Sequence, residues 1–199
     1  MSKGNRSCKD SPQNLTPILS TRSLASDNPS SGNKAIAVSG PSGSGKTELI
    51  CRLLDWFGPQ GLTVAVLKHS HHPEVGDDGK DTWRYRQAGA RLVALAAPGL
   101  VQVTRRFPVE PPLEDVLAAL APEADLILVE GYKSSLIPKL ALVDRRGGQQ
   151  LPDYPRIIAL VSPVPLATSL PVFQPHQVGA IGRFILDFLR PGPGREGKG

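Results

Sequence analysis

The sequence predicts an α/β fold in which a mainly parallel β-sheet has helices on both faces and added antiparallel strands. Three observations support this. A glycine-rich octet at residues 40–47 stands between a short apolar run and an amphipathic stretch. Further apolar runs alternate with segments of helical periodicity up to residue 189, as in right-handed βαβ units. The strand expected at 125–129 has four apolar residues, 126–129, and is followed by an acid, as expected of a buried strand that reaches the carboxyl edge of such a sheet.

The first unit is a strand, a loop and a helix. Residues 35–38 form a short apolar run bounded by turn residues, which predicts a buried strand. A turn at 58–61 leads to a second apolar strand at 62–67. After the octet, apolar residues at helical spacing predict a helix that begins near Lys46: Leu49, Ile50, Leu53, Leu54 and Phe57.

The middle of the chain is more polar. Residues 69–80 are expected to form a mobile loop, after which Asp81 caps a short helix that reaches residue 89. Strands at 91–97 and 100–104 are joined by a Pro-Gly turn. Because no helix precedes 100–104 or the later segment at 139–143, these two are expected to supply the antiparallel strands. The remaining elements are expected at 113–120 (helix), 125–129 (strand), 157–161 (strand) and 178–189 (helix).

We expect one domain at residues 35–190 between disordered tails at 1–34 and 191–199. Residues 1–34 carry a charge of +3 and residues 190–199 carry +2, which accounts for the net charge of +5. The domain itself is neutral, so a nucleic-acid partner is not expected. Two cysteines make no disulfide framework, and no apolar stretch is long enough to cross a membrane, which favours a cytoplasmic protein.

The octet carries the chemistry. It fits the phosphate-binding pattern G-x-x-x-x-G-K-[ST], in which backbone N–H groups and a helix N-terminus surround phosphate oxygens. Lys46 is expected to reach the β- and γ-phosphates, and the Thr47 hydroxyl to hold Mg²⁺. The alternative is a Gly/Ser-rich linker that contains Lys-Thr by chance. The expected nucleotide-binding residues are Gly40, Pro41, Ser42, Gly43, Ser44, Gly45, Lys46, Thr47, Glu48 and Lys68.

Two further features concern charge near the octet. Glu130 follows the four apolar residues at 126–129 and is expected to hold Mg²⁺ opposite Thr47; the alternative is an acid that merely ends a strand. Lys68 opens the sequence Lys-His-Ser-His-His. The crowded spacing of these histidines and the lack of a remote Cys or His partner disfavour a structural zinc site. We expect instead a loop over the phosphates, with Lys68 neutralising charge and Asp81 near the metal.

Together with the octet, a set of ordered segments resembles one protein family. The segments are Val-Leu-Lys-His-Ser-His-His at 66–72, Gly-Lys-Asp-Thr at 79–82 with Arg84 and Arg86, Ala-Gly-Ala at 88–90, Leu-Val-Glu-Gly-Tyr-Lys at 128–133 and Ile-Pro-Lys at 137–139. Over residues 35–190 the chain resembles the MobB proteins of molybdopterin-guanine dinucleotide biosynthesis. The resemblance implies a SIMIBI-class P-loop protein that binds GTP and has weak GTPase activity. It also implies a homodimer that acts with MobA, the guanylyltransferase that joins GMP to molybdenum-bound molybdopterin.

The resemblance also implies site residues. In the SIMIBI class, a carboxylate after the second strand and another after the Walker-B strand help to place Mg²⁺. In this sequence they are Asp81 and Glu130, and with Lys46 they form the expected catalytic set. Lys133 and Lys139 are expected on a face available to an anionic pterin or to a protein partner.

The sequence departs from expectation in its base-reading residues. The guanine-reading pattern [NT]-K-x-D is absent, and the strand at 157–161 is followed by Ser162-Pro163, where an acid is expected. A preference for GTP therefore rests on the resemblance alone. Arg84 and Arg86 are candidate cations for hydrolysis, on a short helix that moves when a dimer or partner closes the site.

Two other functions remain open from the residues. A small-molecule kinase or ligase on the same scaffold would use Lys68 and the 69–81 loop to hold an acceptor, and would turn over rapidly when that acceptor is present. A nucleotide-free interaction module would not need Lys46 for binding any triphosphate.

Overall fold

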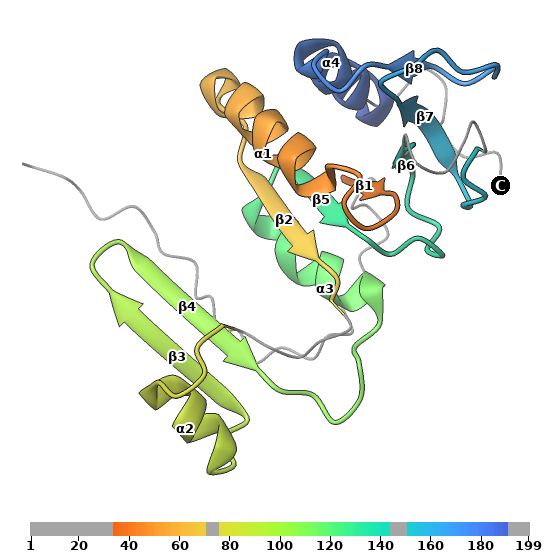
Figure 1. Cartoon of the computed structure of the whole chain (residues 1–199). Coiled ribbons are helices and arrows are strands. Elements are labelled where there is room, and N and C mark those ends of the chain that lie inside the picture. The colour runs from red at the N-terminus through yellow and green to blue at the C-terminus, as the bar shows by residue number, and fades with distance from the viewer. Residues whose placement is uncertain (1–33, 71–75, 144–150, 191–199) are drawn as a thin grey trace, which may run out of the picture.

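A six-stranded sheet lies at the centre of the chain (Figure 1). The computed structural model describes residues 34–70, 76–143 and 151–190. Apart from Lys34, the tails that the sequence predicts to be disordered lie outside this described part. So do residues 144–150 and, within the predicted mobile loop, residues 71–75.

The sheet has the strand order β2-β5-β1-β6-β7-β8, and each neighbouring pair is parallel. The predicted mainly parallel sheet is therefore confirmed. β8 escapes prediction from the sequence because a strand of two residues is too short to show a periodicity. The strands are β1 (Ala35–Ser39), β2 (Val64–Lys68), β5 (Leu126–Glu130), β6 (Lys139–Leu142), β7 (Ile157–Val161) and β8 (Val172–Phe173).

Helices cover both faces of the sheet, as predicted. α1 (Lys46–Phe57) and α4 (Val178–Leu189) pack on one face, and α3 (Leu113–Leu120) packs on the other (Figure 1). The 3-10 turns η1 (Gly58–Gln60) and η2 (Ala121–Glu123) follow α1 and α3. Within the described residues, no helix is both long enough and apolar enough to cross a membrane.

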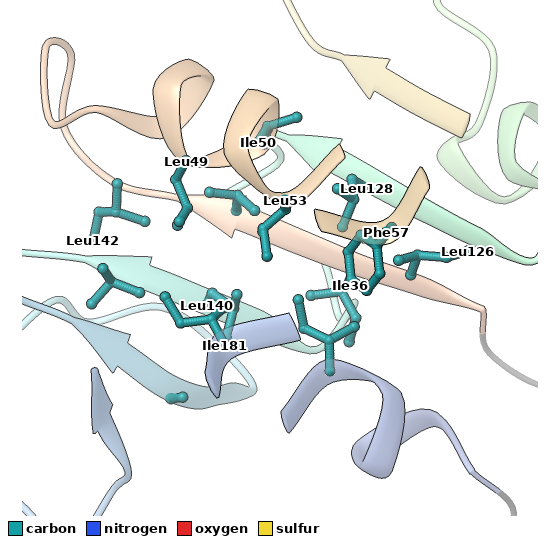
Figure 2. Close-up of a cluster of buried hydrophobic side chains, with 14 residues drawn as sticks. Ile36, Leu49, Ile50, Leu53, Phe57, Leu126, Leu128, Leu140, Leu142 and Ile181 are labelled. Atoms are coloured by element: carbon teal, nitrogen blue, oxygen red, sulfur yellow. The ribbon is translucent and has the colours of Figure 1, made fainter. Parts of the chain in front are cut away.

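The pleat of the central strands divides the core into two clusters. Ile36 and Val38 of β1 point toward α1 and α4, whereas Ala35 and Ala37 point toward α3. The larger cluster lies between the sheet and the α1–α4 pair (Figure 2). β1 and β5 are buried along their whole length, which explains why both read as continuous apolar runs in the sequence.

The direction of β6 differs from the expectation. The segment at 139–143 was expected to be antiparallel, but β6 runs parallel to both β1 and β7. The reason is a stagger in the sheet: Ala37 pairs with both Val129 of β5 and Lys139 of β6, so β6 begins level with the end of β5. The chain returns by only a short distance between these strands, and a loop suffices where a full crossover requires a helix.

The antiparallel strands form a separate hairpin. β3 (Leu92–Ala97) pairs with β4 (Leu100–Arg105), and α2 (Asp81–Gln87) packs on β3, at a distance from the six-stranded sheet in Figure 1. The expected hairpin is confirmed. The expected cap is corrected, because Asp81 is the first residue of the helix and the N-cap is Lys80.

The N-terminus of α2 is fastened by a buried ion pair. Arg86 donates to both carboxylate oxygens of Asp77 at 2.5 Å, and the Thr82 hydroxyl donates to the same carboxylate at 2.7 Å. The hydrogen bonds from Arg86, followed by that from Thr82, hold the pKa of Asp77 well below its usual range. Arg86 is buried by this pairing. A role for Arg86 in hydrolysis stays a prediction, and in this structure its guanidinium is engaged by Asp77.

α1 and α4 pack so closely at Gly182 and Trp56 that adding one methyl group at Gly182 tests the contact. Because a Cβ at Gly182 would lie 2.2 Å from Cε3 of the half-buried Trp56 ring, Gly182→Ala should displace that ring. We predict a loss of about 1–3 kcal/mol in the free energy of unfolding, measured by denaturant titration. This loss should appear although alanine is the better helix former by about 1 kcal/mol.

Gly179→Ala is the matched control. Its Cβ would lie 3.2 Å from Nε1 of the same ring, a contact that a small adjustment relieves, so its effect should stay within about 1 kcal/mol. Equal or greater stability of Gly182→Ala than of the wild type would contradict the close packing of Trp56.

Candidate functional site

The octet lies at the carboxyl edge of the sheet, between β1 and α1, in the strand–loop–helix context that the motif requires. Gly43 and Gly45 have φ angles of 73° and 89°, in the left-handed region that favours glycine. Gly40 is needed for another reason: a Cβ there would lie 3.0 Å from the Leu142 carbonyl oxygen and 2.8 Å from Ser44 Oγ. The glycines of the octet thus fold the loop tightly against the end of β6.

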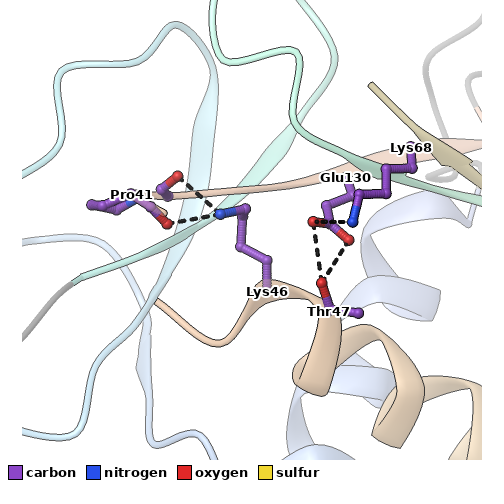
Figure 3. Close-up of polar contacts among 6 residues, drawn as sticks. Pro41, Lys46, Thr47, Lys68 and Glu130 are labelled. Atoms are coloured by element: carbon purple, nitrogen blue, oxygen red, sulfur yellow. Dashed lines mark hydrogen bonds and ion pairs between the residues drawn. The ribbon is translucent and has the colours of Figure 1, made fainter. Parts of the chain in front are cut away.

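Lys46 lies across the loop (Figure 3). Its Nζ donates to the carbonyl oxygens of Pro41 at 2.7 Å and of Gly40 at 3.3 Å. Burial lowers the pKa of Lys46; the charge of Glu130 opposes this shift, and nearby Lys133 and Lys68 add to it. Because neutral carbonyls are weaker partners for an ammonium than phosphate oxygens, this side chain is ready to exchange them for an anion.

Glu130 connects the octet to β2. Thr47 Oγ1 donates to its two carboxylate oxygens at 3.0 and 3.2 Å, and Lys68 Nζ lies 3.5 Å from Oε1 (Figure 3). Glu130 is only 9% exposed. A hydroxyl and a carboxylate that face each other are hard oxygen donors of the kind Mg²⁺ prefers, so these residues fit the expected cation.

Most of the expected nucleotide-binding residues share one cavity, whereas Gly40, Pro41 and Ser44 do not line it. It has a volume of about 540 Å³ and is lined by Ser42, Gly43, Gly45, Lys46, Thr47, Glu48, Cys51, Lys68 and Glu130. The structure therefore brings Lys68, Glu48 and Glu130 together with the octet. Cys51 is an additional lining residue that sequence reasoning missed; its position one helical turn after Thr47 is the signal that could have found it.

A second cavity, of about 490 Å³, adjoins the first. The two share Gly43, Gly45 and Glu48, which places the second cavity on the other side of the loop. Within the described residues, Ser44 Oγ is buried without a hydrogen-bond partner beside this cavity. The walls are mostly apolar. Pro163 lies where the sequence was expected to offer a base-reading acid, and sequence reasoning assigned no site role to the other wall residues: Leu49, Leu142, Val143, Val161 and Pro175.

Asp81 is not part of this arrangement. Its exposed carboxylate lies 3.7 Å from Nη1 of Arg84 on the same helix, and it does not line either cavity. A role for Asp81 at the metal stays a prediction. Across the described residues, no three His, Cys, Asp or Glu side chains are grouped closely enough to hold a metal.

The two expected surface lysines differ. Lys133 is exposed, with its Nζ 5.8 Å from the centre of the Tyr154 ring. Lys139 is fully buried, so its expected place on a ligand-facing surface is corrected. Its burial is not predictable from the sequence, because lysine side chains are usually exposed.

His69 lies beside the site. Its ring packs on Tyr132 with 4.3 Å between ring centres, and Nε2 lies 3.1 Å from Oε1 of Glu110. Its backbone N–H donates to the Glu130 carbonyl at 3.0 Å, which fixes the residue after Lys68 against the end of β5. His71 and His72 lie outside the described residues.

Known proteins share both sequence and fold with this chain. Residues 35–163 match the family described as molybdopterin guanine dinucleotide synthesis protein B. The molybdopterin-guanine dinucleotide biosynthesis adapter protein of Haemophilus influenzae is 33% identical over 158 residues, covering 77% of this chain and 88% of that protein. Its Escherichia coli counterpart is 30% identical over 156 residues, covering 75% and 89%. A crystal structure of molybdopterin-guanine biosynthesis protein B superposes with a TM-score of 0.66 at 28% identity, covering 79% of this chain and 99% of that chain.

Removing the Lys46 ammonium tests the site directly. Lys46→Ala leaves the backbone of the loop in place but deletes the side-chain cation aimed at the phosphates. We expect nucleoside triphosphate affinity to fall about tenfold or more, equivalent to a charge-assisted contact of roughly 1.5–3 kcal/mol, measured by calorimetric titration. The matched control is Lys80→Ala, an exposed lysine that lines neither cavity. Unchanged triphosphate binding by a folded Lys46→Ala protein would contradict the assignment.

Proposed function

The chain belongs to the MobB family of molybdopterin-guanine dinucleotide biosynthesis proteins, and from this membership and the geometry of the site we propose that it is a GTP-binding adapter with weak GTPase activity in that pathway. The observation that carries the proposal is the contact between the Thr47 hydroxyl and the buried Glu130 carboxylate beside Lys46. A phosphate-binding loop, a cation and a pair of magnesium ligands then share one cavity.

The phosphates lie along the loop in this proposal. The backbone N–H groups of the octet and the N-terminus of α1 face phosphate oxygens, and Lys46 exchanges its carbonyl partners for the β- and γ-phosphates. Thr47 and Glu130 hold Mg²⁺, which supplies positive charge against the phosphate oxygens. Lys68 lies on the same side and neutralises further charge.

The second cavity accommodates the nucleoside. Its apolar walls, formed by residues such as Val143 and Pro163, suit the flat faces of a purine, and it adjoins the loop at Gly43 and Gly45. The buried Ser44 hydroxyl offers a polar contact there. The assignment of guanine rather than adenine as the bound base rests on family membership.

The isolated protein hydrolyses GTP slowly in this proposal, because none of the described residues that line the cavity around Lys46 and Glu130 is an arginine. Arg52 lines only the adjoining cavity, and it pairs with Glu48. Arg86 is held by Asp77, and Arg84 is exposed on α2. Fast phosphoryl transfer needs an additional cation on the developing charge. We propose that a MobA-type guanylyltransferase that carries the molybdopterin supplies this additional cation or controls the release of nucleotide.

The hairpin supports the proposed homodimer. Both of its strands are sheet edges, and Leu95, Leu100 and Val101 are about half exposed on it. A two-stranded sheet is marginally stable alone. Leu95 and Leu100 lie on one face of the hairpin and Val101 lies on the other, because side chains alternate along each strand. A second copy of this chain, pairing edge to edge, would supply backbone hydrogen-bond partners to the outer edge of one of these strands.

Glu130→Gln tests the magnesium assignment. The amide keeps the shape of the side chain but is a poor ligand for Mg²⁺ and does not pair with Lys68. We expect Mg²⁺-dependent GTP binding to weaken, while metal-free binding stays equal or becomes tighter because Lys68 is released. Titrations with GTP, ATP and CTP, each with and without Mg²⁺, measure both effects and the base preference.

Glu48→Gln is the matched control, because Glu48 lines the same cavity but pairs with Arg52. It should leave the Mg²⁺ dependence unchanged. If Glu130→Gln also leaves it unchanged, Glu130 is an acid that only ends a strand.

The adapter function predicts a slow reaction that responds to a partner. GTP turnover by the protein alone should be well below the roughly 1–100 s⁻¹ typical of kinases, since no arginine is found among the described residues that line the cavity around Lys46 and Glu130. Addition of a MobA-type guanylyltransferase should change turnover or nucleotide release. The measurement is phosphate release alone, with the partner and with small-molecule acceptors. Rapid acceptor-dependent phosphorylation without a partner would favour a kinase instead.

A further inference from the structure

β5 and β6 are connected by a loop, which covers the part of the sheet that a crossover helix usually covers. Residues 131–138 leave the carboxyl edge of the sheet at Glu130 and return along the face that carries α3. Ile137 is buried there with Ala37 and Val129. Ala37 also donates its backbone N–H to the Pro138 carbonyl at 2.9 Å. The loop therefore covers part of the sheet beside α3.

A loop in this position needs donors for its carbonyl groups, because backbone acceptors that are shielded from water are costly when unpaired. Lys139 supplies them from inside: its Nζ donates to the carbonyl oxygens of Ser135 and Ile137, and it also contacts Ser135 Oγ. Arg156 donates to the Leu136 carbonyl between them at 3.0 Å, from the exposed side. Three successive carbonyls thus accept hydrogen bonds from two cations.

Lys139 is a costly residue to bury. Its exposed fraction is 0%, and within the described residues it forms no ion pair with a carboxylate. Burial lowers its pKa, and the nearby charge of Arg156 lowers it further. An apolar side chain of similar volume would fill the same space at a smaller desolvation cost. The interior of the sheet therefore does not require a lysine, whereas the carbonyls of the loop do.

The other end of this loop touches the proposed nucleotide site. Gly131 and Tyr132 have φ angles of 102° and 45°, so the chain turns sharply just after Glu130. Ser39 Oγ donates to the Gly131 carbonyl at 2.8 Å, and the Tyr132 ring packs on His69, the neighbour of Lys68. Movement of the loop would therefore change the position of Glu130. It would also change the position of Lys68, through the contact between Tyr132 and His69.

We propose that Lys139 is a positioning residue: its buried ammonium holds the 131–138 loop against the sheet and thereby fixes the Glu130 carboxylate opposite Thr47. This inference rests on the proposed function, in which those two residues hold Mg²⁺. It gives Lys139 a role without contact with either nucleotide or metal.

Lys139→Met tests it, since methionine fills the space of the alkyl stem without a donor. We expect Mg²⁺-dependent GTP binding to weaken about tenfold, because the competent loop conformation becomes a minor one, while metal-free GTP binding changes little. The melting temperature should change little, because the smaller desolvation cost of methionine is offset by the loss of the donor to the Ser135 and Ile137 carbonyls. The backbone amides of Gly131 and Ser135, which donate to Val38 and Tyr132, should exchange faster with solvent, while those of β1 stay protected.

Arg156→Met is the matched control. It removes the hydrogen bond to the neighbouring carbonyl of the same loop, but from an exposed side chain that water can replace, so binding should change by about twofold or less. An effect as large as that of Lys139→Met would overturn the specific role of the buried lysine.

The failure of this inference is distinguishable from failure of the proposed function. If Lys46→Ala weakens GTP binding as expected but Lys139→Met retains the wild-type Mg²⁺ dependence, Lys139 only packs and the inference is overturned. If Lys46→Ala binds as the wild type does, the proposed function fails instead. Should Lys139→Met not fold, exchange in the wild type decides: slow exchange at Gly131 and Ser135 supports a fixed loop, and exchange at rates of exposed amides overturns it.

Discussion

Lys68 of β2, Glu130 of β5 and Val38 of β1 lie side by side at one level of the sheet, and this parallel register determines the rest of the site. Because side chains alternate along a strand, Lys68 and Glu130 both point to the face that carries α1, as Val38 does. The octet begins two residues after Val38 and starts the same helix. A slip of one residue in β5 would turn Glu130 to the opposite face and remove it from Thr47.

The same sheet also shows why its two faces are covered differently. The face with α1 and α4 holds large apolar side chains and the octet, so two helices are needed to bury it. The opposite face carries α3 and the 131–138 loop. The stagger between β5 and β6 leaves no room for a crossover helix, and a cation beneath the loop replaces the internal hydrogen bonds that a helix would have provided. Lys139 and the short connection are thus two consequences of one stagger.

The features that were predictable from sequence are those encoded by local periodicity and by the octet. The strands at 35–38, 62–67 and 157–161, the helices and the hairpin all emerge from spacing of apolar residues, and the octet identifies its own loop. The direction of β6 was not predictable, since it depends on how far the chain must return and not on residues 139–143. The buried state of Lys139 and the pairing of Arg86 with Asp77 depend likewise on contacts between segments. The walls of the second cavity come from β6, β7 and the segment before α4, which meet only in the folded sheet.

The contacts of the cations suggest an order of events within the proposed function. Glu130 now accepts from Thr47 and faces Lys68 at 3.5 Å, so its carboxylate is already engaged on two sides. A triphosphate on the loop offers Lys68 a stronger partner than a single carboxylate, and withdrawal of Lys68 lowers the positive charge at Glu130. Glu130 is then a better ligand for a divalent cation than it was before the nucleotide arrived. Because linkage is reciprocal, a cation at Glu130 also favours the release of Lys68 toward the phosphates. Within the proposed function, binding of nucleotide and binding of metal would therefore be coupled through one ion pair, and this coupling would need no movement of the backbone that the register of β2 and β5 holds in place.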